Sequence, residues 1–302
     1  MTAQREVWTI LKLLNWTKQY FASKGVENPR LDAEVLLCAV LDYSRIQLYT
    51  HFDEPLNPDE LKKYKEYVVR RVKREPVAYI LGKKGFMQYD FKVTKDTLVP
   101  RPETELLVEN LIALNQDKGP REILDLGVGS GAILVSLLGN LPEARGLGVD
   151  ISPGAVEVTL ENAKTVGVED RCAVLISDLY ANIPRDEKFH VIVSNPPYIP
   201  KKDLAGLAPE VHQEPVTALD GGEDGLDFYR RILNNIWDYL LPDGLAAFEI
   251  GIGESEAVSA LCREAGLGKV RVCKDYGGID RMVFAAKEGT VYGNEIMELK
   301  ER

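Results

Sequence analysis

Residues 122–132 read Glu-Ile-Leu-Asp-Leu-Gly-Val-Gly-Ser-Gly-Ala, and this stretch decides the fold. Its first five residues form an apolar run typical of a buried strand, and an apolar helical run follows Ala132. The three glycines between them let the backbone turn sharply and come close to a ligand. A helix N-terminus at such a turn favours negative charge, so the stretch predicts the first strand, loop and helix of a nucleoside-binding α/β fold.

Strand-like and helical runs alternate through the rest of the chain after residue 120. Helices are expected between most of the strands, for example at Gly154–Val166 and Phe228–Leu240. Alternation of this kind predicts a Rossmann-like fold, in which a mostly parallel seven-stranded sheet carries helices on both faces. The predicted strands are Glu122–Leu126, Gly146–Val149, Ala173–Ile176, Val191–Ser194, Leu245–Ile250, Val270–Cys273 and Arg281–Ala286.

Residues 1–75 are predicted to be helical. Apolar residues recur at helical spacing over residues 7–14 and 33–41. A third helix is predicted from Asp59 to Arg74, after the start signal Asn57-Pro58. We therefore expect a small helical bundle, whose third helix carries a Lys/Arg face that is either solvated surface or a contact for a partner.

The segment between these two regions has a different pattern. Two glycines and alternating aromatic residues over Tyr79–Val93 predict a hairpin. We therefore expect three parts: a helical domain at residues 1–75, a β-hairpin linker at residues 76–99 and the sheet domain at residues 100–302.

Composition excludes several classes of protein. With 302 residues, 45% of them hydrophobic and 28% charged, the chain suits a soluble protein with a sizeable core rather than a disordered one. No run approaches the ~18 apolar residues of a membrane span, and the N-terminus lacks the layout of a signal peptide. The four cysteines lie far apart, which favours reduced thiols, a cytoplasmic protein and no metal site.

Charge is divided unevenly along the chain, whose formal net charge is −10. Residues 1–85 hold 15 Lys and Arg against 11 Asp and Glu, whereas the remainder holds 22 against 36. So acidic a sheet domain is a poor candidate for binding a nucleic-acid backbone. It suits a basic protein partner better.

Taken alone, the glycine loop leaves the cofactor open. Read as G-x-G-x-x-A with an acid about 20 residues further on, it fits a dinucleotide. Read as D-x-G-x-G-x-G, it fits S-adenosylmethionine, with Asp125 and the loop carbonyls facing the methionine ammonium. A purely structural glycine turn is the third interpretation. Asp125 would repel a pyrophosphate, which disfavours the dinucleotide, and in either cofactor site Asp150 is placed to accept hydrogen bonds from ribose hydroxyls.

Two further strand ends carry polar residues. Asp178 follows the third strand, where it is predicted to accept a hydrogen bond from an adenine amino group while Leu179 covers the ring. Asn195-Pro-Pro-Tyr198 follows the fourth strand, at the edge where open α/β sheets bind ligands. The two prolines stiffen this loop and fix where the Asn195 side chain and the neighbouring carbonyl point.

The chemistry that suits this loop is methylation of a planar nitrogen. The lone pair of an amide or exocyclic amine is delocalised, so the group is a weak nucleophile. If the Asn195 side-chain oxygen and the Pro196 carbonyl accept its two N–H groups, the lone pair can face a methyl donor. Tyr198 would offer a flat wall, and no dedicated acid or metal is required. The structural alternative is a proline-stiffened loop with a capping Asn.

With these residues in view, the chain resembles the HemK/PrmC family, the protein-(glutamine-N5) methyltransferases of peptide chain release factors. The resemblance covers nearly the whole length. The Asn-Pro-Pro-Tyr motif alone is also found in adenine-N6 DNA methyltransferases and in some ribosomal RNA enzymes. The other segments therefore distinguish this family from those enzymes. The segments that carry the resemblance are residues 98–105 (LVPRPETE), 125–131 (DLGVGSG), 194–200 (SNPPYIP), 214–225 (EPVTALDGGEDG) and 275–281 (DYGGIDR).

The resemblance implies a class I S-adenosylmethionine-dependent methyltransferase domain, with an N-terminal helical domain that engages the substrate. It implies methylation of the glutamine in the Gly-Gly-Gln motif of a class 1 release factor. Arg101 and Glu103 would help to order the cofactor and close the pocket, or form a plain surface ion pair. By motif, the cofactor site would include Gly127, Val128, Gly129, Ser130, Gly131, Asp150, Leu179 and Asn195, and the glutamine would be held by Asn195, Pro196, Pro197 and Tyr198.

Two residues depart from the family pattern. Val128 stands where the family often has Thr, and Leu179 stands where an aromatic residue often covers the adenine, which predicts weaker cofactor binding. The alternatives in substrate are a ribosomal-protein glutamine and an adenine-N6 or guanine-N2 of nucleic acid, which the acidic charge disfavours. An NAD(P) oxidoreductase and a non-catalytic binding protein are the more distant alternatives. We expect a cytoplasmic monomer that binds neither membrane nor nucleic acid directly.

Overall fold

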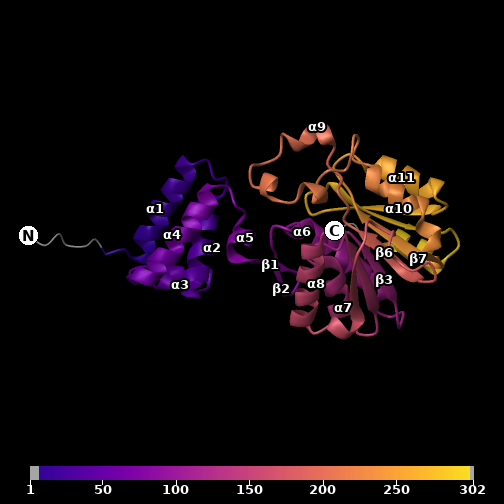
Figure 1. Ribbon diagram of the computed structural model, residues 1–302, viewed down its shortest axis with the longest axis horizontal. Coiled ribbons are helices and arrows are strands. Elements are labelled where there is room, and N and C mark those ends of the chain that lie inside the picture. The colour runs from indigo at the N-terminus through magenta and orange to yellow at the C-terminus, as the bar shows by residue number, and fades with distance from the viewer. Residues whose placement is uncertain (1–6, 300–302) are drawn as a thin grey trace, which may run out of the picture. The chain divides into compact units, whose positions relative to one another are not determined.

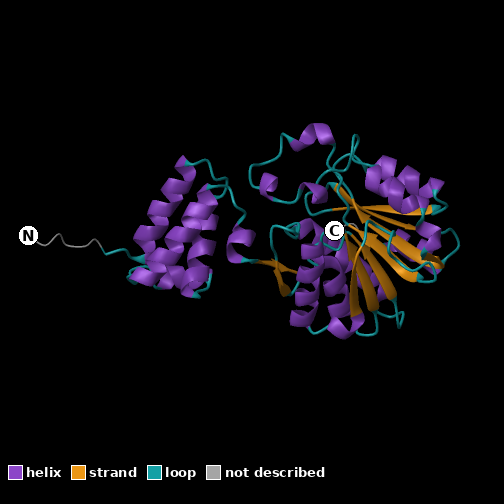
Figure 2. Cartoon of the chain, in the orientation of Figure 1, coloured by secondary structure: helices purple, strands orange, loops and turns teal. Residues whose placement is uncertain are grey.

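The computed structural model describes residues 7–299, which form two compact units (Figures 1 and 2). The N-terminal unit consists of Met1–Gly82 and Ala208–Gln213, and the C-terminal unit of Lys83–Leu207 and Glu214–Arg302. The division after Gly82 assigns the hairpin to the C-terminal unit. The three functional parts expected from the sequence, with boundaries after residues 75 and 99, are not tested by this division and stay predictions.

The N-terminal unit is a bundle of helices, as the sequence predicts. Phe21, Leu36 and Tyr64 are fully buried at its centre, and the Tyr64 hydroxyl donates to the Ala33 carbonyl at 3.1 Å. Asn57 caps the fourth helix by accepting hydrogen bonds from two amides of its first turn. The sequence did not predict the short helices α3 and α5. The helices are α1 (Ile10–Ser23), α2 (Pro29–Leu41), α3 (Arg45–Thr50), α4 (Pro58–Val72) and α5 (Val77–Leu81).

The C-terminal unit contains a two-stranded hairpin and a seven-stranded sheet in the order β5-β4-β3-β6-β7-β9-β8. The strands from β5 to β7 are parallel, and β9 runs antiparallel to both β7 and β8. The predicted α/β fold with a mostly parallel sheet is therefore confirmed. The strands are β1 (Lys83–Phe86), β2 (Tyr89–Lys92), β3 (Glu122–Leu126), β4 (Arg145–Asp150), β5 (Cys172–Ile176), β6 (Phe189–Ser194), β7 (Leu240–Glu249), β8 (Lys269–Lys274) and β9 (Asp280–Ala286).

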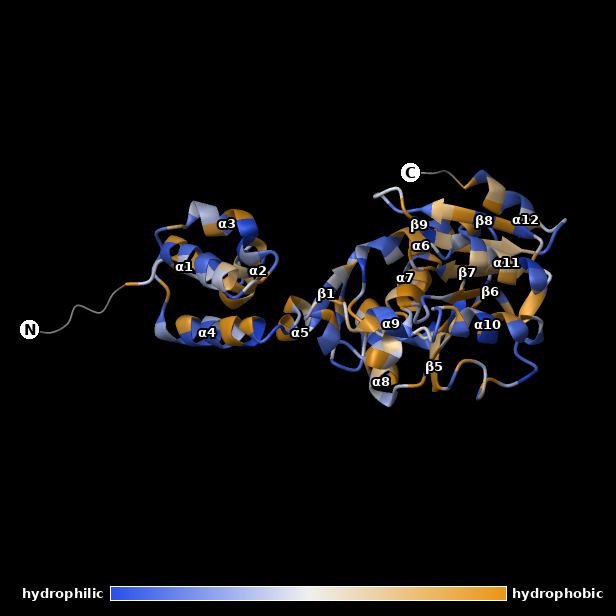
Figure 3. Ribbon diagram, turned by 90° about the horizontal axis from the view of Figure 1, so that it is seen from above, coloured by the Kyte–Doolittle hydropathy of each residue, from blue (hydrophilic) through white to orange (hydrophobic). Residues whose placement is uncertain are grey.

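Helices cover both faces of this sheet (Figure 2). One buried cluster joins α6, α7 and α8 to one face, and a second joins α10 and α11 to the other. Figure 3 shows a contrast that follows from burial. Helix α7 is almost wholly hydrophobic, whereas hydrophobic and hydrophilic positions alternate along α4. The helices of this unit are α6 (Pro102–Asn115), α7 (Ala132–Asn140), α8 (Pro153–Val166), α9 (Lys201–Leu204), α10 (Asp227–Asn234), α11 (Ser255–Glu264) and α12 (Val291–Glu295).

One predicted helix was too long. The helix expected over Phe228–Leu240 ends as α10 at Asn234, and a short 3-10 turn at Ile236–Asp238 follows it. Leu240 then begins β7, where it pairs with Phe189 of β6. Of the apolar residues after Asn234, Ile236 lies in this turn and Leu240 joins the sheet, so strand pairing overrides their helical spacing.

The strand order places a ligand site at one edge of the sheet. From β3 the chain moves outward to β4 and β5, then returns to add β6 on the other side of β3. In an open α/β sheet this reversal leaves a crevice at the carboxyl ends of the strands. In the part of the chain that the structure describes, no helix has the length and apolar character to cross a membrane.

Candidate active site

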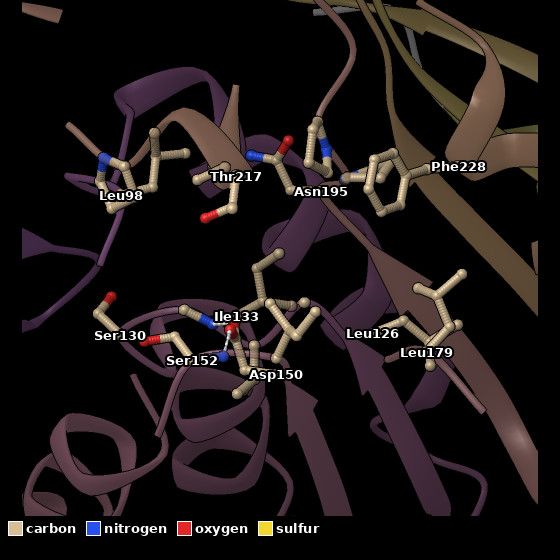
Figure 4. A pocket seen from close by; sticks show the side chains of 18 of the residues that line it. Leu98, Leu126, Ser130, Ile133, Asp150, Ser152, Leu179, Asn195, Thr217 and Phe228 are labelled. Atoms are coloured by element: carbon tan, nitrogen blue, oxygen red, sulfur yellow. Dashed lines mark hydrogen bonds between the residues drawn. The ribbon is translucent and has the colours of Figure 1, made fainter. Parts of the chain in front are cut away.

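A cavity of about 380 Å³ lies at the carboxyl ends of β3, β4, β5 and β6, which is within the usual size range of small-molecule sites (Figure 4). It lies where the strand order reverses. Of the residues predicted for the site, the cavity is lined by Arg101, Gly127, Val128, Gly129, Ser130, Asp150, Asp178, Leu179, Asn195, Pro196 and Pro197. Glu103, Asp125, Gly131 and Tyr198 are not part of the lining.

The glycine loop is held tightly beneath the cavity. Gly127, Gly129 and Gly131 all have positive φ, at 81°, 58° and 81°. A Cβ on Gly131 would come within 2.8 Å of the Thr159 side chain, so this glycine is required for close packing as well as for its φ. The Thr159 hydroxyl donates to the Gly129 carbonyl at 3.0 Å. Gly131 thus shapes the loop from behind without lining the cavity.

Asp150 ends β4 and is tied to the loop. One carboxylate oxygen accepts the Gly129 amide and the other accepts the Ser152 amide, both at 2.9 Å. Burial raises the pKa of Asp150, while these amides lower it. The carboxylate is therefore fixed in one direction at the cavity wall, next to the loop (Figure 4).

The wall after β5 contains Asp178 and Leu179, together with contacts that the sequence did not predict. Asp178 forms an ion pair with Arg231 at 2.7 Å, and both side chains are half-exposed. Leu179 adopts a positive φ of 51°, with its carbonyl accepting the Ser177 hydroxyl at 2.7 Å. Phe228 also lines the cavity, with the Arg231 guanidinium 5.4 Å from its ring centre. An aromatic side chain is thus present at this wall, although it comes from α10 and not from position 179.

The Asn195-Pro-Pro-Tyr198 segment follows β6 directly. The Ser194 hydroxyl donates to the Leu126 carbonyl at 2.6 Å, which locks this strand end against β3. Asn195 lies at the cavity wall, and its Nδ2 donates to Thr104 Oγ1 at 3.4 Å. Tyr198 is half-buried outside the cavity lining, and its burial raises its pKa. Its hydroxyl lies 3.5 Å from a carboxylate oxygen of Glu249.

Arg101 has a partner that sequence reasoning missed. It lines the cavity and forms an ion pair at 2.6 Å with Glu214, a buried residue. The other Glu214 oxygen accepts the Val99 amide at 3.0 Å. Glu103 is exposed in the first turn of α6, away from the cavity lining. The segment after Glu214, residues 215–218, also lines the cavity, so this ion pair anchors one of its walls.

Asp125 is enclosed beside the loop. Its side chain is almost fully buried and does not line the cavity, and within residues 7–299 neither carboxylate oxygen has a side-chain hydrogen-bond partner, although the Leu134 amide favours its charged form. Burial raises its pKa to about 7, and the neighbouring Asp150 carboxylate adds to the shift. A cation bound at the loop would stabilise this carboxylate. Among the described residues, no group of three or more His, Cys, Asp or Glu is arranged to hold a metal ion.

Two protein-family models match the chain: the PrmC N-terminal domain over residues 12–82 and the methyltransferase small domain over residues 102–220. A protein of Geobacter sulfurreducens named release factor glutamine methyltransferase is 47% identical over 284 residues, which are 94% of this chain and 98% of that protein. The chain belongs to the release factor glutamine methyltransferase family. Family members from Moorella thermoacetica and Caulobacter vibrioides are 41% and 40% identical, each over 92% of this chain, and the matches cover 98% and 96% of those proteins.

Solved structures agree on the fold of this family member. The catalytic domain of hMettl16, in complex with a hairpin of the MAT2A 3′UTR, aligns with a TM-score of 0.55 over 90% of this chain and 92% of that chain. Its sequence identity is 15%, so the likeness shows the fold alone. The C-terminal unit has the Rossmann-like fold of class I S-adenosylmethionine-dependent methyltransferases, as predicted.

Proposed function

We propose that this chain transfers a methyl group from S-adenosylmethionine to the side-chain amide nitrogen of the glutamine in the Gly-Gly-Gln motif of a class 1 peptide chain release factor. Its membership of the release factor glutamine methyltransferase family supports this proposal. The single observation that carries the chemistry is the position of Asn195 and Pro196, at the wall of the cavity that the glycine loop also lines.

The residues present fit S-adenosylmethionine. The fixed Asp150 carboxylate lines the cavity and suits the two ribose hydroxyls. Asp125 lies outside the lining, where its buried carboxylate adds negative charge beside the loop and so favours a cofactor that carries positive charge. Leu179 and Phe228 offer apolar surfaces for the adenine. Arg231 occupies one oxygen of Asp178, which leaves the other for the adenine amino group. When bound, the sulfonium supplies an activated methyl group with a neutral thioether as leaving group.

The side-chain amide of the substrate glutamine is held through hydrogen bonds from its two N–H groups. We propose that the Asn195 side-chain oxygen and the Pro196 carbonyl accept the two N–H groups of the glutamine, with Pro197 and Tyr198 stiffening and backing the loop. Accepting both hydrogens increases the electron density on nitrogen and directs its lone pair into the cavity. On transfer of the methyl group, the glutamine nitrogen would lose one amide proton, which the Asn195 oxygen or the Pro196 carbonyl would pass to solvent. Arg101 closes the cavity from the side held by Glu214.

The two units receive separate roles in this proposal. The N-terminal unit recognises the release factor, and the hairpin connects it to the catalytic unit. We propose that the protein acts as a cytoplasmic monomer, without direct contact to nucleic acid or membrane.

One experiment tests the function. The protein is incubated with labelled S-adenosylmethionine and, in separate reactions, a release factor, the same factor with its Gly-Gly-Gln glutamine changed to alanine, total ribosomal protein, and DNA. Mass spectrometry then locates the methyl group. We expect a gain of one methyl on that glutamine and none on the alanine variant. Label on ribosomal protein or DNA alone would overturn the proposal and identify the alternative substrate.

A further inference from the structure

A hydrogen-bonded chain runs from Asn195 through Thr104, which also lines the cavity, to a buried carboxylate. Thr104, in the first turn of α6, donates from its hydroxyl to Glu249 Oε2 at 2.5 Å, and accepts from Asn195 Nδ2 at 3.4 Å. Glu249 is the last residue of β7, and both it and Thr104 are more than 95% buried. Three segments far apart in the sequence thus meet at one amide.

The direction of each hydrogen bond follows from the chemistry of the groups. An ionised carboxylate only accepts hydrogen bonds, so the Thr104 proton must point to Glu249. The lone pairs of the Thr104 oxygen are then left to accept, and the Asn195 group that faces them must be its NH₂. The Asn195 oxygen is consequently turned away from this chain of residues. The two ends of an Asn amide have nearly the same shape, so packing alone would not select this orientation.

We propose that Thr104 and Glu249 are positioning residues that hold the Asn195 amide with its oxygen toward the substrate glutamine. The inference rests on the proposed function, since it concerns which end of Asn195 meets the glutamine N–H groups. In the opposite orientation an Asn195 N–H would face a substrate N–H, and the acceptor that holds the nitrogen would be lost.

Glu249 is itself anchored by separate contacts. Its backbone carbonyl accepts the Tyr229 hydroxyl at 2.7 Å, and its Oε1 lies 3.5 Å from the Tyr198 hydroxyl. The first contact fixes the backbone of Glu249, and the second joins its carboxylate to the loop that also carries Asn195.

The carboxylate is poised to lose its charge near neutral pH. Burial raises the pKa of Glu249 to about 7, against the hydrogen bonds from Thr104 and Asn195. Arg281 on β9 favours the charged form, and Glu103 on α6 disfavours it. A protonated Glu249 can donate to Thr104, which frees the Thr104 proton to turn toward Asn195. Activity should therefore fall as the pH decreases through about 7.

The test uses a matched pair of substitutions. Thr104→Val keeps the shape and removes the hydroxyl, whereas Thr104→Ser keeps the hydroxyl. We expect Thr104→Val to lower kcat by about 10- to 100-fold, the order of loss when a catalytic group is misplaced. The Kd for S-adenosylmethionine should stay within about twofold, and Thr104→Ser should recover most of the kcat. Thr165→Val, which removes an exposed helix hydroxyl from α8 outside the cavity lining, is the control.

Other outcomes overturn the inference. An unchanged kcat in Thr104→Val would show that the hydroxyl does not orient Asn195, and an equal loss of cofactor binding would show a plain structural role. If Thr104→Val fails to fold, Glu249→Gln decides, because its amide does not titrate and should remove the fall in kcat between pH 8 and 6. A retained pH dependence in that variant counts against the proposal. A wild-type protein that does not methylate the glutamine refutes the proposed function instead.

Discussion

The cavity has two halves that are built in different ways. The cofactor half consists of the glycine loop and Asp150, which lie within about 25 residues of sequence and hold one another through backbone amides. The acceptor half brings together Thr104, Asn195, Glu214 and Glu249 from four separate segments, mainly through side-chain contacts. A local motif therefore specifies the loop side of the proposed cofactor site, whereas the adenine wall and the geometry of the acceptor depend on the assembled sheet.

Asn195→Ala should break the acceptor half alone and have the largest effect on turnover. Removing one positioned hydrogen-bonding group from a reacting centre costs on the order of 10²- to 10³-fold in kcat. The Kd for S-adenosylmethionine should change little, because the glycine loop and Asp150 remain intact. Single-turnover methylation and calorimetric titration measure the two quantities. Asn294→Ala, at an exposed position on α12, is the control. Equal losses of turnover and cofactor binding would show that the two halves are not separable in this way.

Gly131→Ala should break the cofactor half. An added Cβ would meet Thr159 at 2.8 Å, and the φ of 81° is strained for alanine. Strain of this kind costs about 1–3 kcal/mol of stability, and movement of the loop should weaken cofactor binding by about 10-fold. Gly167→Ala is the matched control, since Gly167 has a φ of 80° with open space around it. A comparison of Tm and Kd then separates backbone strain from the clash. If both variants bind the cofactor equally well, close packing at Gly131 has no part in binding.

The same contrast explains what the sequence could predict. The seven strands, the glycine loop and the position of Asn195 follow from local patterns, because strand ends of a parallel sheet meet at one edge. The Arg101–Glu214 ion pair was missed although both residues lie in motifs, since their pairing spans 113 positions. Thr104 lies in the family segment 98–105 and Glu249 lies near the end of a predicted strand, but neither was singled out as a site residue. Contacts of this kind depend on strand order and register, which the spacing of residues along the sequence does not specify.

Phe228→Leu should have the smallest effect of these substitutions. It tests whether the two halves of the cavity are independent. Leu179 suggested from sequence that aromatic cover of the adenine was lost, yet Phe228 lies at the same wall of the cavity. If its ring stacks on the adenine, leucine keeps the apolar cover and loses the aromatic contribution of about 0.5–1.5 kcal/mol, a 2- to 13-fold rise in Kd for S-adenosylmethionine. The saturating kcat should stay unchanged, because the acceptor half is untouched. Phe52→Leu, at an exposed aromatic position in the N-terminal unit, is the control. A fall in kcat at saturating cofactor would mean that α10 also shapes the acceptor half, and the two halves would then be mechanically joined through this helix.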